Sequence, residues 1–405
     1  MPVNRRKDSS SPNLAYGPVD GLLLGAILLL LVGGLIMVLS ASIHTATMNQ
    51  SSGNFYFMRN GLFAALGVTV MLTISRIPYT FYQRYVALIL LAAITVMTLV
   101  LVPALGHTAG RATRWFNVFG IFMFQPTEFA KIAFVIYLAH VTSAKAKSLH
   151  SLWKGYLPPL AVAGVLMGLA LAEPDFGTAV IFGALVVTLL FVAGTRLAYV
   201  AFTFAFLIPT AVYMIYHNSM RFNRVMAFLD PWAHRYDTAY ATVNSLAAMA
   251  TGGLTGVGLG RGQQKIGYIP EAQTDFILSV VGEELGLIGT LGLITLYLIV
   301  ILRGLKAAKN APDSFGQTLG FGLVLLLTIQ VFINVGVAYA VLPTKGLTLP
   351  LVSYGGTSMV MTCVSMGILL QLSRCQNERR HKNPAQHDAK DNAGAVPLRL
   401  SGESL

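Results

Sequence analysis

The sequence predicts an all-α protein, a polytopic integral membrane helical bundle of about ten transmembrane helices. Two observations predict it. Of the 405 residues, 55% are hydrophobic and only 11% are charged, whereas soluble domains carry about 25% charged residues. The mean hydropathy is +0.66, and apolar runs long enough to cross about 30 Å of hydrocarbon recur along the whole chain. We therefore expect the bundle itself to be the domain, with no soluble domain of any size.

Ten apolar runs reach the length of a membrane span. The first follows Arg5, Arg6 and Lys7, but it is longer than the core of a signal peptide and lacks a small-residue cleavage site. We expect it to remain in the protein as a signal anchor. The expected spans are 21–43, 58–75, 86–105, 126–143, 156–172, 177–194, 197–215, 276–302, 315–340 and 355–373.

The basic residues between the spans predict that both termini are cytoplasmic. This orientation places roughly twice as many lysines and arginines inside as outside, as the positive-inside rule requires. Residues 1–20 then form a cytoplasmic N-terminal tail and 21–373 form the transmembrane domain. A large extracytoplasmic loop, about 216–275, joins the seventh and eighth spans. The polar residues 374–405 form a cytoplasmic tail, which we expect to be disordered.

The formal net charge of +12 does not indicate a nucleic-acid partner. Its basic residues are dispersed between apolar runs, so the lipid bilayer is the expected surrounding. Cys363 falls in the last span and Cys375 in the tail, so neither is placed to form an exported disulfide. His107, His217 and His234 lack the spacing of metal ligands. Cysteine and histidine chemistry is not expected.

The stretch 268–286 carries four acids toward the eighth span, the first of which is Glu271. Asp275 is the last polar residue before an apolar run, and Glu283 and Glu284 follow about two helical turns further on. An ionised side chain at the bilayer centre costs roughly 2.5 to 3.5 kcal/mol, so acids here are candidates for function. The alternative for Asp275 is that it only caps the helix, because acids are favoured at a helix N-terminus.

Two earlier segments also place charges at the ends of spans. Glu128 and Lys131 are three residues apart on an expected helix, so they can face each other. An ion pair that fixes helix packing and a direct role with substrate are both open. Pro174 breaks a span, and we expect Asp175 to cap the helix that follows. Glu173 and Asp175 together could also help to hold a divalent cation.

Prolines and glycines interrupt the segment 342–358, which would otherwise form two apolar spans. Unwound backbone at membrane depth is tolerated only where protein buries it or where it lines a cavity. Lys345 is therefore a candidate phosphate partner, with an interfacial lysine reaching toward water as the alternative. A basic set in the long loop could neutralise a diphosphate or contact anionic head groups. This set is Arg221, Arg224, Arg261 and Lys265.

These motifs, in this order on ten spans, resemble the SEDS family (shape, elongation, division and sporulation) of bacterial membrane proteins. The likeness covers nearly all of residues 20–373. The string Leu-Pro-Thr-Lys-Gly-Leu-Thr-Leu-Pro at 342–350 is similar to the division-specific branch of the family. So is Ser-Tyr-Gly-Gly, which contributes Ser353, Gly355 and Gly356.

The resemblance implies a peptidoglycan glycosyltransferase that polymerises lipid II into β-1,4 glycan strands. It would act at the outer face of the bacterial cytoplasmic membrane, at the division septum. The family's catalytic acid falls on Asp275, which would act as the general base. Lys345, the loop arginines or a divalent cation (Mg²⁺ or Mn²⁺, ligands unknown) would neutralise the leaving diphosphate. Other family motif positions fall on Arg114, Trp115, Gln125, Pro126, Glu128, Lys131, Glu173, Pro174, Asp175, Gly177 and Thr178.

The resemblance also implies protein partners. These are a class B penicillin-binding protein, the septal transpeptidase that cross-links the new strands, and other membrane proteins of the division machinery. Two rival functions are open. A flippase for the same lipid carrier would also use broken spans, but it needs a polar path to both faces. A scaffold would only recruit partners, and it has no use for an acid at position 275.

Overall fold

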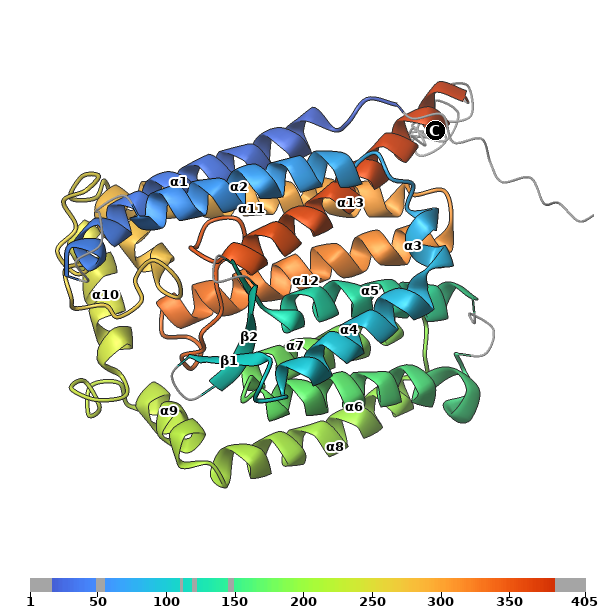
Figure 1. The fold of residues 1–405 in the computed structure, drawn as a ribbon, viewed down its shortest axis with the longest axis horizontal. Helices are drawn as coiled ribbons and strands as arrows, with labels where there is room; N and C mark the ends of the chain where they lie inside the picture. Colours follow the sequence, from blue (N-terminus) through green and yellow to red (C-terminus); the bar gives the residue numbers. More distant parts are fainter. Residues whose placement is uncertain (1–16, 49–54, 110–111, 119–121, 145–148, 383–405) are drawn as a thin grey trace, which may run out of the picture.

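The computed structural model describes residues 17–48, 55–109, 112–118, 122–144 and 149–382. Each of the ten expected spans coincides with a long helix, and these helices run side by side through the bundle (Figure 1). They are α1 (Gly21–Met48), α2 (Phe55–Ile74), α4 (Val86–Val100), α5 (Pro126–Ala144), α6 (Leu157–Ala172), α7 (Phe176–Val192), α8 (Leu197–Tyr216), α11 (Ile277–Lys309), α12 (Ser314–Ala338) and α13 (Gly356–Lys382).

Seven of the described helices are long and apolar enough to cross a membrane, and α4 and α7 are shorter apolar helices. Helices suit this environment because lipid offers the backbone no hydrogen-bonding partners. The chain is a multi-pass membrane protein. One boundary differs from the expectation, since α13 continues to Lys382. The helix thus extends into the expected cytoplasmic tail as far as residue 382, and residues 383–405 lie outside the described part of the chain. The disorder of the tail stays a prediction.

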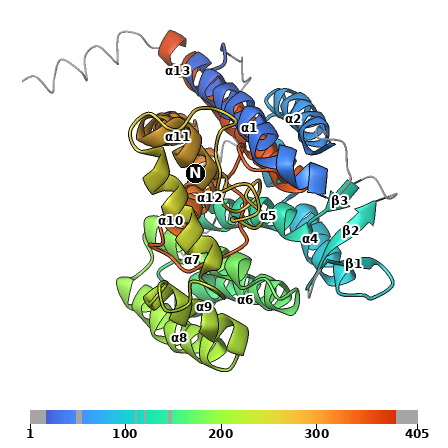
Figure 2. The ribbon, with the colours of Figure 1, turned by 90° about the vertical axis from the view of Figure 1, so that its left-hand side faces the viewer.

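The long helices pack in layers. On one side α1 packs against α11, and α2 against α13; α12 and α5 occupy the middle, and α4, α6, α7 and α8 complete the other side (Figures 1 and 2). The middle of the bundle is filled by large side chains such as Phe134 on α5 and Phe182 on α7, whose rings meet edge to face at 5.6 Å. By contrast, α8 lies at the edge and exposes Phe202 and Phe206. A rigid interior therefore supports the helix ends.

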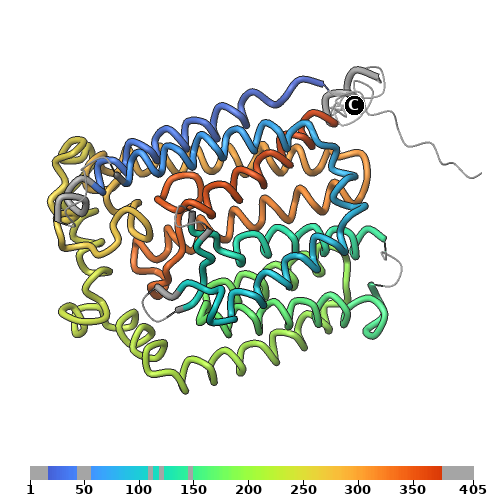
Figure 3. Tube along the Cα trace, viewed as in Figure 1, coloured from blue at the N-terminus to red at the C-terminus, as the bar shows by residue number. Residues whose placement is uncertain are grey.

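Short elements gather at one end of the bundle, which we call the loop end (Figure 3). They are α9 (Ser219–Leu229), α10 (Tyr240–Gly252) and a three-stranded antiparallel sheet of β1 (Gly106–Ala109), β2 (Ala112–Val118) and β3 (Phe122–Phe124). The hydrophobic pattern of the sequence does not predict this sheet. The opposite end holds α3 (Thr80–Arg84) and a π-helical turn, η2 (Leu152–Tyr156).

Helix α11 is broken near its start, and the glycine-rich segment 252–258 fills the break. Gly286 has φ +67°, outside the helical region. The backbone of 252–258 replaces the bonds that the break removes, because the N–H of Leu287 donates to Gly253 O and the N–H of Gly258 donates to Glu284 O. A side chain at Gly256 would overlap the carbonyl of Glu284. Glycine is needed here for close backbone approach.

Candidate active site at the loop end

Asp275 lies on the last turn before α11, at the loop end. Its N–H donates to the carbonyl of Glu271 at 3.2 Å. The N-cap position of α11 is occupied by Phe276, and no side chain caps the helix there. The alternative that Asp275 merely caps this helix is therefore wrong, because its carboxylate accepts no hydrogen bond from the first turn of α11. The Asp275 carboxylate is therefore free of a capping role.

Two polar side chains fix the backbone around Asp275. The side-chain amide of Asn334 on α12 donates to the carbonyl of Asp275 at 3.1 Å and to that of Leu347 at 2.8 Å. The hydroxyl of Ser353 donates to the carbonyl of Thr274 at 2.6 Å. Both contacts tie the turn before α11 to the interrupted segment 342–355. Because Asn334 is 2% exposed, its two bonds are shielded from water.

Burial raises the pKa of Asp275 from 3.8 to about 7. Desolvation is the main cause, because it penalises the charged carboxylate. The negative charge of Glu271 raises the pKa further, and the positive charge of Arg224 opposes both effects. A carboxyl with a pKa near neutrality is well matched to accepting a proton from an alcohol.

A cavity of about 470 Å³ lies at the loop end. Four separate parts of the chain form its wall: β2, the start of α7, α9 with the end of α8, and the segment 343–347. Gly346 connects this cavity to Asp275, since a methyl group added at Gly346 would lie 3.3 Å from the Oδ2 atom of Asp275. The polar residues that line the cavity are Arg114, Asp175, Asn218, Arg221, Arg224, Thr344 and Lys345.

The cavity is strongly cationic. Three arginines and Lys345 line it, with Asp175 as the one acidic residue in its wall. Asp175 is occupied as the N-cap of α7, as expected: its Oδ1 accepts the N–H of Thr178 at 3.1 Å and its Oδ2 accepts the Thr178 hydroxyl at 2.8 Å. Burial lowers the pKa of Lys345, and the charge of Asp175 partly offsets this effect. Such a wall suits an anion with several oxygens.

Arg114 and Glu173 lie together beside the cavity. The guanidinium of Arg114 donates from Nε to the carbonyl of Glu173 at 2.8 Å and from a second nitrogen to the carbonyl of Pro174. The Glu173 carboxyl is fully buried, and both of its oxygens lack a hydrogen-bond partner among the described residues. Burial, with help from the charge of Asp175, raises the pKa of Glu173 to about 8 although Arg114 lowers it. A neutral carboxyl is the cheaper form in such a place.

The remaining sequence candidates lie away from the cavity. Lys265 is buried in an ion pair with Glu284, and its ammonium also donates to the Ser40 hydroxyl at 2.7 Å. Glu283 accepts the backbone N–H groups of Gln263 and Gln264. Glu283 and Glu284 thus anchor the long loop to α11. Because Lys265 is paired with Glu284, it is not available to bind a diphosphate. Arg261 is exposed and does not line the cavity.

Trp115 and the Glu128–Lys131 pair also stand apart from the cavity. Trp115 is on β2, opposite His107 in the register of the sheet. Glu128 and Lys131 form a buried ion pair at 2.8 Å, as the spacing predicts. They border a space of about 10 Å³ inside the bundle, which is about the room needed for one water molecule. The arrangement favours the packing role over contact with a large substrate.

The expected motif 353–356 holds the segment in shape. The Ser353 hydroxyl accepts the N–H of Leu349 at 2.9 Å while it donates to Thr274. A methyl group at Gly355 would lie 3.1 Å from Thr348, and one at Gly356 would overlap the ring of Phe63. The two glycines therefore allow close packing of the segment that carries Lys345.

Phe176, Asn334 and Gly346 are among the residues of the site that sequence reasoning missed. An amide inside an apolar span is costly, so the position of Asn334 within 315–340 carried a usable signal. The position of Phe176 carried no such signal, because an aromatic residue at the start of an apolar run is typical of a side chain that only packs. The role of Gly346 depends on its distance to a residue far away in the sequence.

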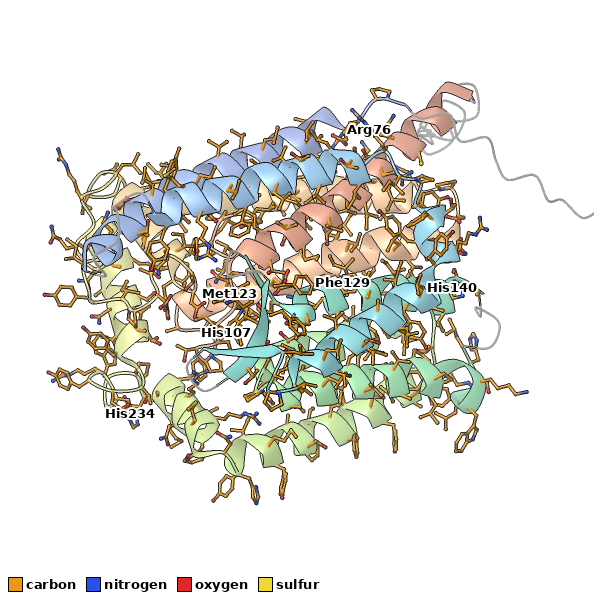
Figure 4. All side chains as sticks on the ribbon, in the orientation of Figure 1. Arg76, His107, Met123, Phe129, His140 and His234 are labelled. Atoms are coloured by element: carbon orange, nitrogen blue, oxygen red, sulfur yellow. The ribbon has the colours of Figure 1, made fainter. Side chains whose placement is uncertain are left out.

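The described residues contain no group of three or more His, Cys, Asp and Glu side chains that could hold a metal ion. The histidines are scattered, and Figure 4 places His234 at the loop end and His140 at the opposite end. Near the cavity, the carboxylate of Asp175 is already engaged by Thr178. The divalent cation expected from the sequence stays a prediction, in which a carboxylate near the cavity would share the ion with oxygens of the substrate.

Comparison with known proteins gives close relatives over most of the chain. The curated "probable peptidoglycan glycosyltransferase FtsW" of Geobacter metallireducens is 40% identical over 340 residues, which is 84% of this chain and 90% of the relative. The protein of the same name from Coxiella burnetii is 38% identical over 85% of this chain and 93% of its own. The stage V sporulation protein E of Bacillus subtilis is 35% identical over 88% of this chain and 97% of its own.

Solved structures match as well. A chain from a study of polymerization and crosslinking by a peptidoglycan synthase complex has a TM-score of 0.72 and 27% identity, and the match covers 90% of this chain and 99% of that one. The rod shape determining protein RodA of Thermus thermophilus has a TM-score of 0.64 and 25% identity over 90% and 98%. A family model described as a cell cycle protein matches residues 21–378. The chain belongs to the FtsW, RodA and SpoVE family of cell cycle proteins.

Proposed function

We propose that this protein is a peptidoglycan glycosyltransferase that polymerises lipid II, a disaccharide-peptide on a polyprenyl diphosphate. One observation carries the proposal. Asp275, with a pKa raised to about 7, lies beside a cavity of about 470 Å³ lined by four cationic side chains. A base next to an anion site is what transfer of a sugar from a diphosphate requires.

In this reaction the 4-hydroxyl of the acceptor sugar attacks the anomeric carbon of the donor. Asp275 takes the hydroxyl proton as the new bond forms, and the bond to the diphosphate breaks on the opposite face, so an α-linkage becomes β. Arg221, Arg224 and Lys345 stabilise the negative charge that develops on the leaving diphosphate. Gly346 lines the cavity next to Lys345 and also lies close to the Asp275 carboxylate, so the proposed base and the cations are neighbours.

The finer biological setting belongs to the same proposal. The relatives named FtsW support a role in building the division septum, and the synthase-complex neighbour supports a cross-linking partner, a class B penicillin-binding protein. Other division-machinery membrane proteins complete the proposed assembly. The distribution of basic residues supports cytoplasmic termini, which puts the loop end at the outer face.

A divalent cation, Mg²⁺ or Mn²⁺, enters the proposal only as a counter-ion that the diphosphate brings with it. Such an ion would supply additional positive charge to the leaving group. The four cavity cations supply that charge from the protein itself. We expect chelation of divalent ions to lower the rate of polymerisation in proportion to their share of this neutralisation.

The cavity favours a transferase over a flippase. All of its lining residues belong to segments at the loop end. The space beside Glu128 and Lys131, deeper in the bundle, has room for about one water molecule. A disaccharide-peptide head group does not fit there in this conformation. A scaffold, in turn, gives no reason for a carboxyl with a raised pKa next to a cationic cavity.

The test uses the purified full-length protein with its cognate cross-linking enzyme, lipid II and a divalent cation. Glycan chains are resolved on a gel for the wild type and for Asp275→Asn. The isosteric change removes the base and keeps the volume, so we expect loss of polymer by several orders of magnitude with unchanged thermal stability. Phe332→Leu, a change of an exposed side chain on α12, is the matched control.

Polymer from Asp275→Asn at the wild-type rate would remove Asp275 from the mechanism. No polymer from the wild type, even with the cross-linking enzyme present, would overturn the transferase. In that case, transfer of lipid II across a vesicle bilayer would separate a flippase from a scaffold.

A further inference from the structure

Two cations in the cavity wall lack a carboxylate partner. Among the described residues, no ion pair within 4.0 Å involves Arg221 or Lys345. The one acid in the wall, Asp175, has both carboxylate oxygens bonded to Thr178. Like charges at close range repel each other, particularly where burial lowers the effective dielectric constant. Something other than an anion must keep both side chains in place before a ligand arrives.

The ring of Phe176 meets both cations. The Cζ atom of Arg221 lies 5.0 Å from the ring centroid, and the Nζ atom of Lys345 lies 5.4 Å from it. Both distances are within the range of about 6 Å at which a cation is attracted to the face of an aromatic ring. Phe176 directly follows the helix cap Asp175, so the start of α7 fixes its position.

This ring also joins three segments that are distant in the sequence. Phe176 begins α7, Arg221 belongs to α9, and Lys345 belongs to the interrupted segment 342–355. Figure 2 looks onto the loop end and shows α9 beside α7 and α8, at the edge of the molecule. The position of Arg221 is otherwise supported by a long contact from its guanidinium to the carbonyl of Met214 at 3.5 Å. Phe176 is thus the shared contact between both cations.

We propose that Phe176 is a positioning residue of the diphosphate site, which holds Arg221 and Lys345 on one wall of the cavity ready for the ligand. This inference rests on the proposed function. An acidic residue at this position would hold the cations more firmly, but it would also neutralise them and compete with the diphosphate. An aromatic ring attracts them and leaves their charge intact. Binding therefore begins from ordered cations, which lowers its entropic cost.

The test measures binding of inorganic pyrophosphate to the full-length protein in lipid nanodiscs, by calorimetry. Phe176→Leu keeps an apolar side chain and removes the ring. We expect it to weaken binding about tenfold, which corresponds to about 1.4 kcal/mol. Phe176→Tyr keeps the aromatic face and is expected to bind like the wild type. Phe191→Leu, an exposed position at the other end of α7, is the matched control and is expected to change nothing.

A double-mutant cycle separates positioning from packing. If Phe176 acts through the cations, Phe176→Leu loses part of its effect when Arg221→Gln or Lys345→Gln is already present, and most of it when both are. Additive effects would show that the ring only packs and would overturn the proposal. Equal binding by Phe176→Leu and the wild type, or no rescue by Phe176→Tyr, would do the same. Phe176→Met is the replacement if Phe176→Leu does not fold.

Polymerisation kinetics give an independent readout. We expect Phe176→Leu to raise the KM for lipid II about tenfold and to lower kcat by a smaller factor, because the ring orders cations that both receive the donor and stabilise the leaving diphosphate. A fall in kcat with constant KM would contradict this role. If the wild type polymerises nothing, the proposed function fails, while the order of pyrophosphate affinities still decides the role of Phe176. Absence of pyrophosphate binding to the wild type overturns the inference.

Discussion

In the proposed mechanism, Asp275 is an effective base because its pKa lies near neutral pH, where the carboxyl can both accept and release a proton. A carboxyl with its ordinary pKa would be a weak base at neutral pH, and desolvation corrects this by raising the pKa to about 7. Arg224 and Glu271 act on it in opposite directions. The same arginine lines the cavity, so the base and the anion site are electrostatically connected. Binding of a diphosphate near Arg224 would weaken its hold on the Asp275 carboxylate and make the base stronger.

The first residue-scale prediction concerns pH. Because the base form of Asp275 is deprotonated, polymerisation should rise with pH through about 7 and level off above it. Glu271→Gln removes a negative neighbour, so it should move this midpoint to lower pH. Arg224→Gln removes a positive neighbour and should move it to higher pH. Initial rates measured across the neutral range check both shifts, and shifts of the same sign would contradict the electrostatic account.

The rate should fall again at high pH. Burial lowers the pKa of Lys345 from its ordinary value of 10.5, so this side chain loses its charge earlier than an exposed lysine. Replacement by arginine, which stays charged, should remove the decline. A high-pH limb that is unchanged in Lys345→Arg would assign the decline to another group.

The second residue-scale prediction concerns Asn334. Asn334→Leu has similar volume but removes both donated bonds, which leaves the carbonyls of Asp275 and Leu347 unsatisfied in a buried place. Each such group costs about 1 to 3 kcal/mol. We expect a lower unfolding temperature and a loss of kcat larger than any change in KM, because the base is displaced. Phe332→Leu on the same helix is the control, and kcat equal to its value would contradict the positioning role.

At the scale of elements, the break in α11 determines how the long loop docks. The acids that precede Gly286 are buried, yet they are satisfied by the loop: Glu284 by Lys265 and Glu283 by backbone N–H groups. The loop in turn carries the chain from α10 to Asp275. Helix α10 is also fastened to α11, since the hydroxyls of Ser245 and Ser279 lie 2.6 Å apart. These contacts between elements thus determine the position of Asp275, the proposed base.

The element-scale prediction follows from the buried ion pair. Lys265→Met or Glu284→Gln alone leaves an uncompensated buried group and should cost about 3 to 5 kcal/mol of unfolding free energy. The double variant removes both charges and should recover most of that loss. Thermal unfolding in detergent measures the three variants. If the double variant loses the sum of both single losses, the two side chains do not form a pair.

At the scale of the whole molecule, all the candidate chemistry is at one end of a membrane bundle. The proposed orientation places this end outside the cytoplasmic membrane, where it reaches a lipid-linked donor. The segment between α9 and α10 lies at the loop end, and η2 lies at the opposite end (Figure 1). Tyr236 in the first segment is 82% exposed, and Trp153 in the second is 76% exposed. These two positions report on the two faces.

The whole-molecule prediction uses single cysteines at these positions in intact cells. Tyr236→Cys should react with a maleimide that cannot cross membranes, and Trp153→Cys should react only after permeabilisation. The native thiols of Cys363 and Cys375 are buried, so the unmodified protein is the control for background. The reverse labelling pattern would show that the loop end faces the cytoplasm, where the cavity could not reach an extracytoplasmic substrate.

The sequence by itself determined the helices, because in lipid both apolar length and satisfied backbone groups are local properties of the chain. It also predicted the cap at Asp175 and the Glu128–Lys131 pair, each from spacing within one segment. The catalytic role of Asp275 came from the family resemblance and stays a proposal. Only the tertiary structure decided which cations share a cavity. It placed Arg221 and Lys345 on the ring of Phe176 but bound Lys265 to Glu284. Such choices depend on which segments meet, and each of these contacts joins residues far apart in the sequence.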